Sequence, residues 1–131
     1  MPCVFCNIIS GKEPANIVYD DPLTIAFLDK YPQARGHLQL VPKTHTRWIY
    51  DLPEVEIGGF FTTAAKITRG IIPVLGANHV SWGTFGQEIP HAHLWIVPRY
   101  ANSTAIYEGG GKKTSNQEEI AKLVAARLKN L

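Results

Sequence analysis

Short runs of β-branched and aromatic residues alternate with turn residues through much of the chain. The runs "ANIVYDD" and "TIAFLDK" are separated by the turn sequence "DDPL", which predicts a β-hairpin. In "GHLQLVPK", His37, Gln39 and Val41 alternate with Leu38 and Leu40, and this period of two predicts a third strand. "HVSWGTF" and "HAHLWIVP" stand on either side of a turn and predict two further strands.

Two segments have helical periodicity instead. Apolar residues at spacings of three and four predict an amphipathic helix over 53–73, and they are Ile57, Phe60, Phe61, Ala64, Ile67 and Ile71. We expect Asp51 to cap its start, and Pro73 with Gly76 to end it. The tail "SNQEEIAKLVAARLKNL" predicts a last helix with Ser115 and Glu118 as a capping box. Five strands and two helices in this order predict an α+β domain with a largely antiparallel sheet.

Length, charge and hydropathy limit the classes of function. The chain has 131 residues, of which 45% are apolar, so we expect one globular domain over 1–131. A net charge of +2 is too small to indicate a nucleic-acid partner. Gly, Pro or charged residues interrupt every apolar run, which argues against a membrane span, and "MPCVFCNIIS" lacks the features of a secretory signal. We therefore expect a cytoplasmic protein whose two cysteines are reduced.

The stretch "GQEIPHAHLWIVPR" contains the first candidate chemistry. On a strand, His91, His93 and Trp95 would share one face, and Ala92 and Leu94 the other. Two imidazoles in one strip of low dielectric constant cannot both carry protons cheaply, so at least one should be neutral near pH 7. A neutral imidazole is a nucleophile, a base or a metal ligand. The alternative is a pair of partly buried histidines that only fill space.

The two cysteines give a second candidate site. "CVFC" has the two-residue spacing with which Cys3 and Cys6 can both reach one zinc ion. The remaining ligands would come from the five histidines of the chain, His37, His45, His79, His91 and His93. A redox pair is less favoured because no strand precedes the motif. A pair of inert thiols is the other alternative.

Two further features would suit a nucleotide. Gly86 and Gln87 precede the histidines, and a glycine there lets backbone N–H groups approach an anion closely. The alternative is that Gly86 only forms a turn. Asp29 ends a strand in "FLDKYPQARGH", where its carboxylate could accept both hydroxyls of a ribose. A solvated loop acid is the alternative for Asp29.

Taken in order, "CVFCNIISGKEPANIVYDD", "IAFLDKYPQARGHLQLVPKTH" and "GQEIPHAHLWIVPR" resemble the histidine triad (HIT) family of nucleotide hydrolases and transferases. The similarity extends from Cys3 to about Arg99. The signature of that family is three histidines on alternate positions, here His91, His93 and, at the third, Trp95. The resemblance implies a HIT-like fold with a five-stranded, mainly antiparallel sheet.

The resemblance also implies a role for individual residues. His93 would attack the α-phosphorus of a nucleotide and form a nucleotidyl-histidine, which water then hydrolyses. His37 would support catalysis. The expected nucleotide-binding residues are Phe27, Leu28, Asp29, Gly86, Gln87, Glu88 and Trp95. Of these, Phe27 or Leu28 would help to wall the base pocket, and the backbone amide of Glu88 would hold phosphate oxygens.

Zinc-containing members of the family imply a structural Zn²⁺ held by Cys3, Cys6, His45 of "PKTH", and His91. Two thiolates and two imidazoles make a closed, four-coordinate set that does not activate water. The metal would hold His91 neutral and leave His93 free to attack. The resemblance further implies a homodimer that pairs the helix over 53–73 and the edge strand beside it.

Trp95 and the sequence "SWG" (81–83) depart from the family pattern at two positions expected to contact phosphate. The indole N–H can only donate a hydrogen bond, whereas an imidazole can also accept one. These departures favour a binding module, whereas the retained His93 favours a hydrolase of nucleoside phosphoramidates or dinucleoside polyphosphates, and the hydrolase is the preferred interpretation. The alternative is a zinc-stabilised module that binds a purine nucleotide, expected to be of the adenosine type, with little or no turnover.

Overall fold

The computed structural model describes residues 3–101 and 116–131. Its strands are β1 (Ile17–Asp20), β2 (Thr24–Leu28), β3 (Leu38–Pro42), β4 (His79–Gly83) and β5 (Leu94–Arg99). Its helices are α1 (Val4–Ile9), α2 (Glu54–Leu75) and α3 (Gln117–Leu128), with a short 3₁₀ turn at Ile49–Asp51. Within the described ranges, no helix is long and apolar enough to cross a membrane.

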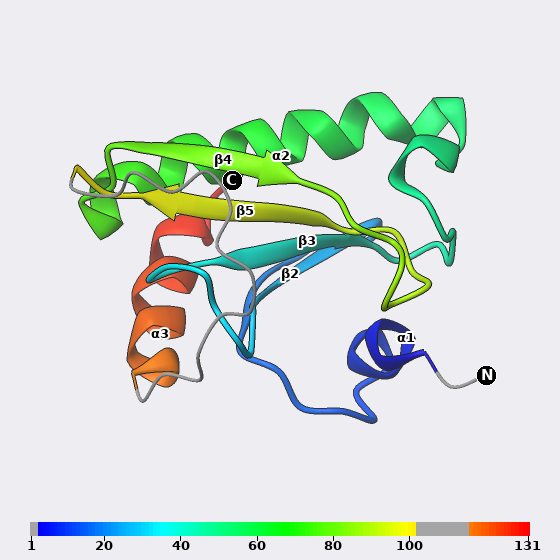
Figure 1. Ribbon diagram of the computed structural model, residues 1–131, viewed down its shortest axis with the longest axis horizontal. Coiled ribbons are helices and arrows are strands. Elements are labelled where there is room, and N and C mark those ends of the chain that lie inside the picture. The colour runs from blue at the N-terminus through cyan, green and yellow to red at the C-terminus, as the bar shows by residue number, and fades with distance from the viewer. Residues whose placement is uncertain (1–2, 102–115) are drawn as a thin grey trace.

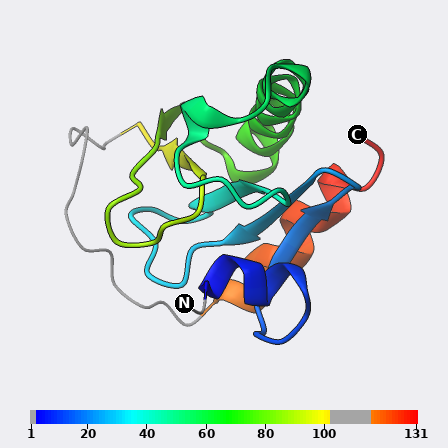
Figure 2. The same ribbon diagram turned by 90° about the vertical axis from the view of Figure 1, so that its right-hand side faces the viewer.

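The strands form one antiparallel sheet in the order β1-β2-β3-β5-β4. Figures 1 and 2 show α2 and α3 on one face of this sheet and α1 on the other. The α+β class and the five antiparallel strands that the sequence predicts are thereby confirmed.

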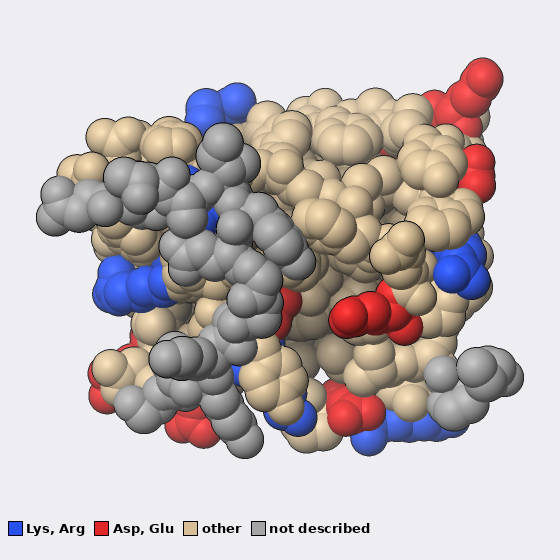
Figure 3. All heavy atoms as spheres, in the orientation of Figure 1, with Lys and Arg blue, Asp and Glu red and all other residues tan. Residues whose placement is uncertain are grey.

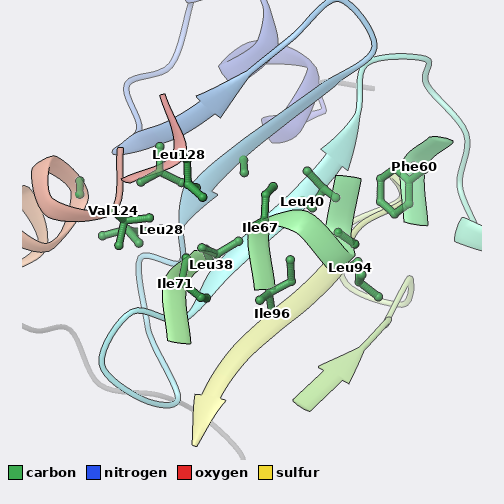
Figure 4. Packing of buried hydrophobic residues seen from close by; sticks show 14 of the residues in the cluster. Leu28, Leu38, Leu40, Phe60, Ile67, Ile71, Leu94, Ile96, Val124 and Leu128 are labelled. Atoms are coloured by element: carbon green, nitrogen blue, oxygen red, sulfur yellow. The ribbon is translucent and has the colours of Figure 1, made fainter. Parts of the chain in front are cut away.

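A large apolar cluster fills the space between the sheet and the two long helices. Ile67 and Ile71 of α2 lie over Leu38, Leu40 and Ile96 of the sheet, as Figure 4 shows, and all five are completely buried. Val124 and Leu128 of α3 extend the cluster. Burial of this face stabilises the sheet and leaves the opposite face for the candidate catalytic and metal-binding side chains.

The opposite face carries a smaller cluster around α1, which the sequence pattern did not predict. Phe5 and Ile8 of α1 pack with Ile25, Phe27 and Val41 of the sheet. The helix has only six residues, and the sulfur of Cys3 accepts a hydrogen bond from the amide of Cys6 at its start. Such a short helix depends on tertiary packing, because propensity alone does not stabilise one turn and a half.

The ends of α2 differ from the prediction. The helix begins after Pro53, and Asp51 lies in the preceding 3₁₀ turn, so Asp51 as the N-cap was wrong. Pro73 lies inside the last turn, and the helix ends two residues later at Leu75. Gly76 provides the stop because its φ of 70° lies in the left-handed region that glycine tolerates.

Two other expected boundaries also change. Asn116 precedes α3 and makes no side-chain capping bond, whereas Ser115 of the expected capping box lies outside the described residues. The strand expected over "HAHLWIVP" starts only at Leu94, where pairing with Leu40 begins. His91 and His93 therefore precede β5 instead of lying within it.

Candidate active site and metal centre

Four side chains from three separate segments converge beside α1. Cys3 and Cys6 belong to its first turn, His45 follows β3, and His91 precedes β5. The Sγ of Cys6 lies 3.1 Å from Nδ1 of His45 and 3.5 Å from Nδ1 of His91. The Sγ of Cys3 lies 3.4 Å from Nδ1 of His91.

These four donor atoms lie within 4.8 Å of one another, so the group could hold one metal ion. The backbone supports this convergence, because the amide of Ala92 donates to the carbonyl of Thr46 at 2.6 Å and joins the two histidine segments. The Nε2–H of His91 donates to the carbonyl of Pro42 at 2.8 Å. This outer hydrogen bond fixes the tautomer that leaves Nδ1 with a free lone pair.

The chemistry of the donor set matches zinc. Two sulfurs and two imidazole nitrogens form a closed set of the kind that holds structural Zn²⁺. Burial, a hydrogen bond with Cys3 and the nearby Cys3 sulfur raise the pKa of the Cys6 thiol to about 11. A bound dication would favour the thiolate form of both cysteines.

His93 lies next to this centre, with one ring nitrogen fixed and the other available. Its Nδ1–H donates to the backbone carbonyl of His91 at 2.8 Å, so the lone pair is on Nε2. The backbone N–H of Phe85 points at Nε2 from 3.4 Å, beyond the usual hydrogen-bond length. Burial lowers the pKa of His93, although the His91 carbonyl and the charge of Asp29 oppose this effect. The ring is therefore kept neutral and nucleophilic.

A second buried histidine lies further along the same face of the sheet. The Nδ1 of His37 accepts a hydrogen bond from the amide of Gln33 at 3.0 Å, so Nε2 carries the proton. That Nε2 lies 3.6 Å from Oδ2 of Asp29 and has no hydrogen-bond partner among the described residues. Burial lowers the pKa of His37 to about 4, opposed by Asp29 and assisted by Arg99. His37 is therefore neutral at pH 7.

Asp29 is partly exposed and already has two protein partners. Its Oδ1 accepts from the amide of Tyr31 at 2.8 Å, and its Oδ2 accepts from the side chain of Gln39 at 2.9 Å. A carboxylate has about four acceptor positions, so two remain for a ligand. The Oε1 of Gln39 is buried without a partner in the described part of the chain. This corner of the sheet thus offers two kinds of unfilled acceptor.

The turn before the histidines brings the backbone N–H of Phe85 to 3.4 Å from Nε2 of His93. Gly86 is buried, and a Cβ placed on it would lie 2.4 Å from the ring of Trp48, so only glycine fits there. Gln87 and Glu88 are exposed. Within the described ranges, the amide of Glu88 donates to no protein group. Such an amide is available to an anion.

The structure brings most of the expected residues to this face, with one correction. Leu28 packs in the cluster beneath α2 and α3, so Leu28 cannot wall a pocket beside His93. Successive side chains of β2 point to opposite faces of the sheet, so Leu28 and Phe27 lie on different faces. Phe27 takes the face of α1 and lies edge-on to Phe5.

Three residues that sequence reasoning missed also lie at the site: Phe5, which packs edge-on against His91 and His93, Gln39, and Phe85. Only Gln39 had a readable signal, as a polar residue on the His37 face of an otherwise apolar strand.

Comparison with known proteins agrees with this fold. The HIT domain model matches residues 10–102. An uncharacterised HIT-like protein of Methanocaldococcus jannaschii is 34% identical over 125 residues, covering 92% of this chain and 96% of the relative. The adenylylsulfatase HINT3 of Arabidopsis thaliana is 29% identical over 102 residues, covering 74% of this chain and 52% of that protein.

Among solved structures, a zinc-bound histidine triad family protein from Mycobacterium smegmatis superimposes with a TM-score of 0.87 and 31% identity. The superposition covers 98% of this chain and 94% of the other. The chain belongs to the HIT domain family.

Proposed function

We propose that this protein is a hydrolase that cleaves a nucleoside phosphoramidate or a dinucleoside polyphosphate at the α-phosphorus. The observation that carries the proposal is the orientation of His93. Its Nδ1 proton is held by the His91 carbonyl at 2.8 Å, which leaves the lone pair on a neutral Nε2, with the backbone N–H of Phe85 at 3.4 Å. An imidazole fixed in one tautomer is prepared for nucleophilic attack without a prior proton transfer.

The reaction would proceed in two displacements. The Nε2 of His93 forms a bond to the α-phosphorus, and the bond from phosphorus to the leaving group breaks with its electron pair. Water then attacks the nucleotidyl-histidine, the electron pair returns to Nε2, and a nucleoside monophosphate is released with one proton passing to solvent. The free amide of Glu88 and the glycine turn at Gly86 would stabilise the charge on the phosphate oxygens.

The nucleoside would bind along the same face of the sheet. The remaining acceptor positions of Asp29 would take the ribose hydroxyls, and Gln39 would hold the carboxylate in place. Phe27 would contribute to the apolar floor of the base pocket through its contact with Phe5. His37 would act by position, because a neutral, buried imidazole cannot serve as an acid at pH 7. We expect the base to be a purine, of the adenosine type.

Cys3, Cys6, His45 and His91 are proposed to hold one structural Zn²⁺. Their sulfur and nitrogen atoms lie within 4.8 Å of one another, and this set fits the ion without leaving an open position. The role of the metal would be to anchor α1 and the segment before β5. His93 would benefit because its partner carbonyl belongs to a metal ligand.

A second candidate function is a nucleotide-binding module with little turnover, and the large Trp95 ring favours it. Intact mass spectrometry after brief incubation with an adenosine phosphoramidate and an acid quench separates the two. A hydrolase is expected to show the added mass of AMP on a fraction of the chains. A binding module would show the unmodified mass, even though it retains nucleotide.

Restoring an imidazole at position 95 is expected to raise turnover. Trp95 stands where the family pattern has its third histidine, and its indole N–H can donate but cannot accept. Trp95→His should increase kcat for an adenosine phosphoramidate by roughly ten-fold, the scale of one added catalytic hydrogen bond. Steady-state kinetics would measure this, with Tyr19→His as the control because Tyr19 lies on β1, at the edge of the sheet away from β5. Unchanged or lower kcat in Trp95→His would contradict the expectation.

We also propose a homodimer through β4 and α2. The edge strand β4 leaves one row of backbone groups unpaired within the described sheet, and such edges invite pairing with another strand. Trp82 of β4 is 44% exposed beside Phe61 of α2, and Figure 3 shows an uncharged area extending over both elements.

Light scattering at micromolar concentration should give about 29 kDa, twice the chain mass of 14.5 kDa. Trp82→Lys should shift the mass toward that of the monomer, because it places a charge in the proposed interface. A monomer mass for the unaltered protein would contradict the dimer.

A further inference from the structure

Three aromatic rings form a continuous row beside His93. The ring of Trp95 lies 4.7 Å from that of His37 and 4.6 Å from that of Phe85, measured between centroids. Phe85 adjoins the nucleophile directly, since its backbone N–H lies 3.4 Å from Nε2 of His93. Phe85 is 44% exposed and Trp95 is half-buried, so part of this row is accessible to a ligand.

The surrounding structure holds these rings in place. His37 is 1% exposed and fixed by the amide of Gln33, so it forms a rigid support on the inner side of Trp95. A Cβ on Gly83 would lie 3.0 Å from the Phe85 ring, which shows how closely that ring packs on β4. The rings of Phe85 and Trp95 are therefore held in fixed positions, and together they form one wall of the site.

We propose that Phe85 and Trp95 form the leaving-group subsite and that it selects an aromatic leaving group, an arylamine or a phenol. The proposal rests on the proposed function of the site. The backbone N–H of Phe85 lies 3.4 Å from Nε2 of His93 and the Phe85 ring lies 4.6 Å from that of Trp95, so the wall adjoins a phosphorus held at Nε2. Aromatic rings favour offset-stacked or edge-on contact with another aromatic ring, and their negative faces do not attract an anion.

The way in which the leaving group separates from phosphorus indicates the same class of leaving group. The indole of Trp95 does not give up a proton near pH 7, so the wall supplies no general acid. A leaving group must then depart with the electron pair of its bond to phosphorus and take its proton from water. An arylamine or phenol stabilises that electron pair by delocalisation into its ring, whereas an alkylamine or alcohol does not.

Two unreactive ligands of equal charge and similar size test the subsite. Adenosine 5′-(benzylphosphonate) and adenosine 5′-(cyclohexylmethylphosphonate) differ in the aromatic character of one ring, and both lack the cleavable P–N bond. Isothermal titration should show roughly five-fold tighter binding of the benzyl compound, the scale of one aromatic pair. Phe85→Leu should reduce the ratio to about two or less. Tyr19→Leu, which removes a ring on β1 at the edge of the sheet away from β5, should keep it.

The outcomes separate the subsite from the function on which it rests. Equal affinity of the two phosphonates for the unaltered protein would overturn the aromatic subsite, whatever the turnover. An unchanged ratio in Phe85→Leu would overturn the assignment to this wall. A retained preference in a protein that hydrolyses no adenosine phosphoranilidate would support the subsite and remove the hydrolase. Absence of binding by both compounds and by AMP would overturn both proposals.

Discussion

Replacing His93 with alanine is expected to reduce hydrolysis of an adenosine phosphoramidate by about a thousand-fold or more, the scale seen when a covalent nucleophile is removed. The Nε2 atom forms its bond to phosphorus only as the reaction proceeds. Ground-state binding would rely on Asp29, the apolar base pocket and the backbone amides. Nucleotide affinity should therefore stay within roughly three-fold of the unaltered protein, because only transition-state interactions are lost.

Single-turnover kinetics and intact mass measure both parts of this expectation. His93→Ala should lose the AMP adduct together with turnover, while titration with AMP still reports binding. His79→Ala is the matched control, because His79 is exposed on β4 and its Nδ1 lies 2.9 Å from Oδ1 of the neighbouring Asn78. Equal activity in His93→Ala and the unaltered protein would leave a nucleotide-binding module as the function.

Removing the metal is expected to give the second large effect. Purified protein should contain about one zinc ion per chain, in the tetrahedral set that closed structural sites use. Cys3→Ser should lose this zinc and lower the melting temperature by roughly 10 °C or more, since metal binding contributes directly to folding. The loss should be concentrated in α1, which has six residues and buries only Phe5 and Ile8.

Metal analysis with calorimetry tests this prediction, and Ser10→Ala is the control because Ser10 follows α1 without contributing a ligand. Turnover should also fall in Cys3→Ser, since the carbonyl that fixes His93 belongs to His91. Protein kept reduced and free of chelators that contains no zinc would refute the assignment and leave Cys3 and Cys6 as plain thiols.

The elements with strong local patterns were the ones predicted well. Alternation over "GHLQLVPK" identified β3, and the spacing of apolar residues identified α2 as a long amphipathic helix. The exact ends were less predictable. Pro73 and Gly76 together were expected to end α2. The helix continues past Pro73 to Leu75 and ends at Gly76, whose left-handed backbone conformation glycine tolerates.

The short helix α1 shows why local pattern has limits. "VFCNII" has no cap signature and is too short to be stable alone. It forms because Phe5 and Ile8 bury themselves against β2 and β3, and because Cys3 caps its first turn. The same distant packing decides the surroundings of His91 and His93, both of which contact Phe5 edge-on.

The sequence by itself determined the α+β class and the antiparallel sheet, because period and turn residues are local properties, and its resemblance to the HIT family implied the candidate ligands and nucleophile. Only the tertiary structure decided that Cys3, Cys6, His45 and His91 meet within 4.8 Å, that Leu28 faces the other side of the sheet, and that Phe85 lies beside Trp95. These contacts depend on which strands pair in the sheet, on the face that each side chain takes, and on the residues that α1 covers. Burial then lowers the pKa of His37 to about 4, an effect that arises only when surrounding residues exclude water.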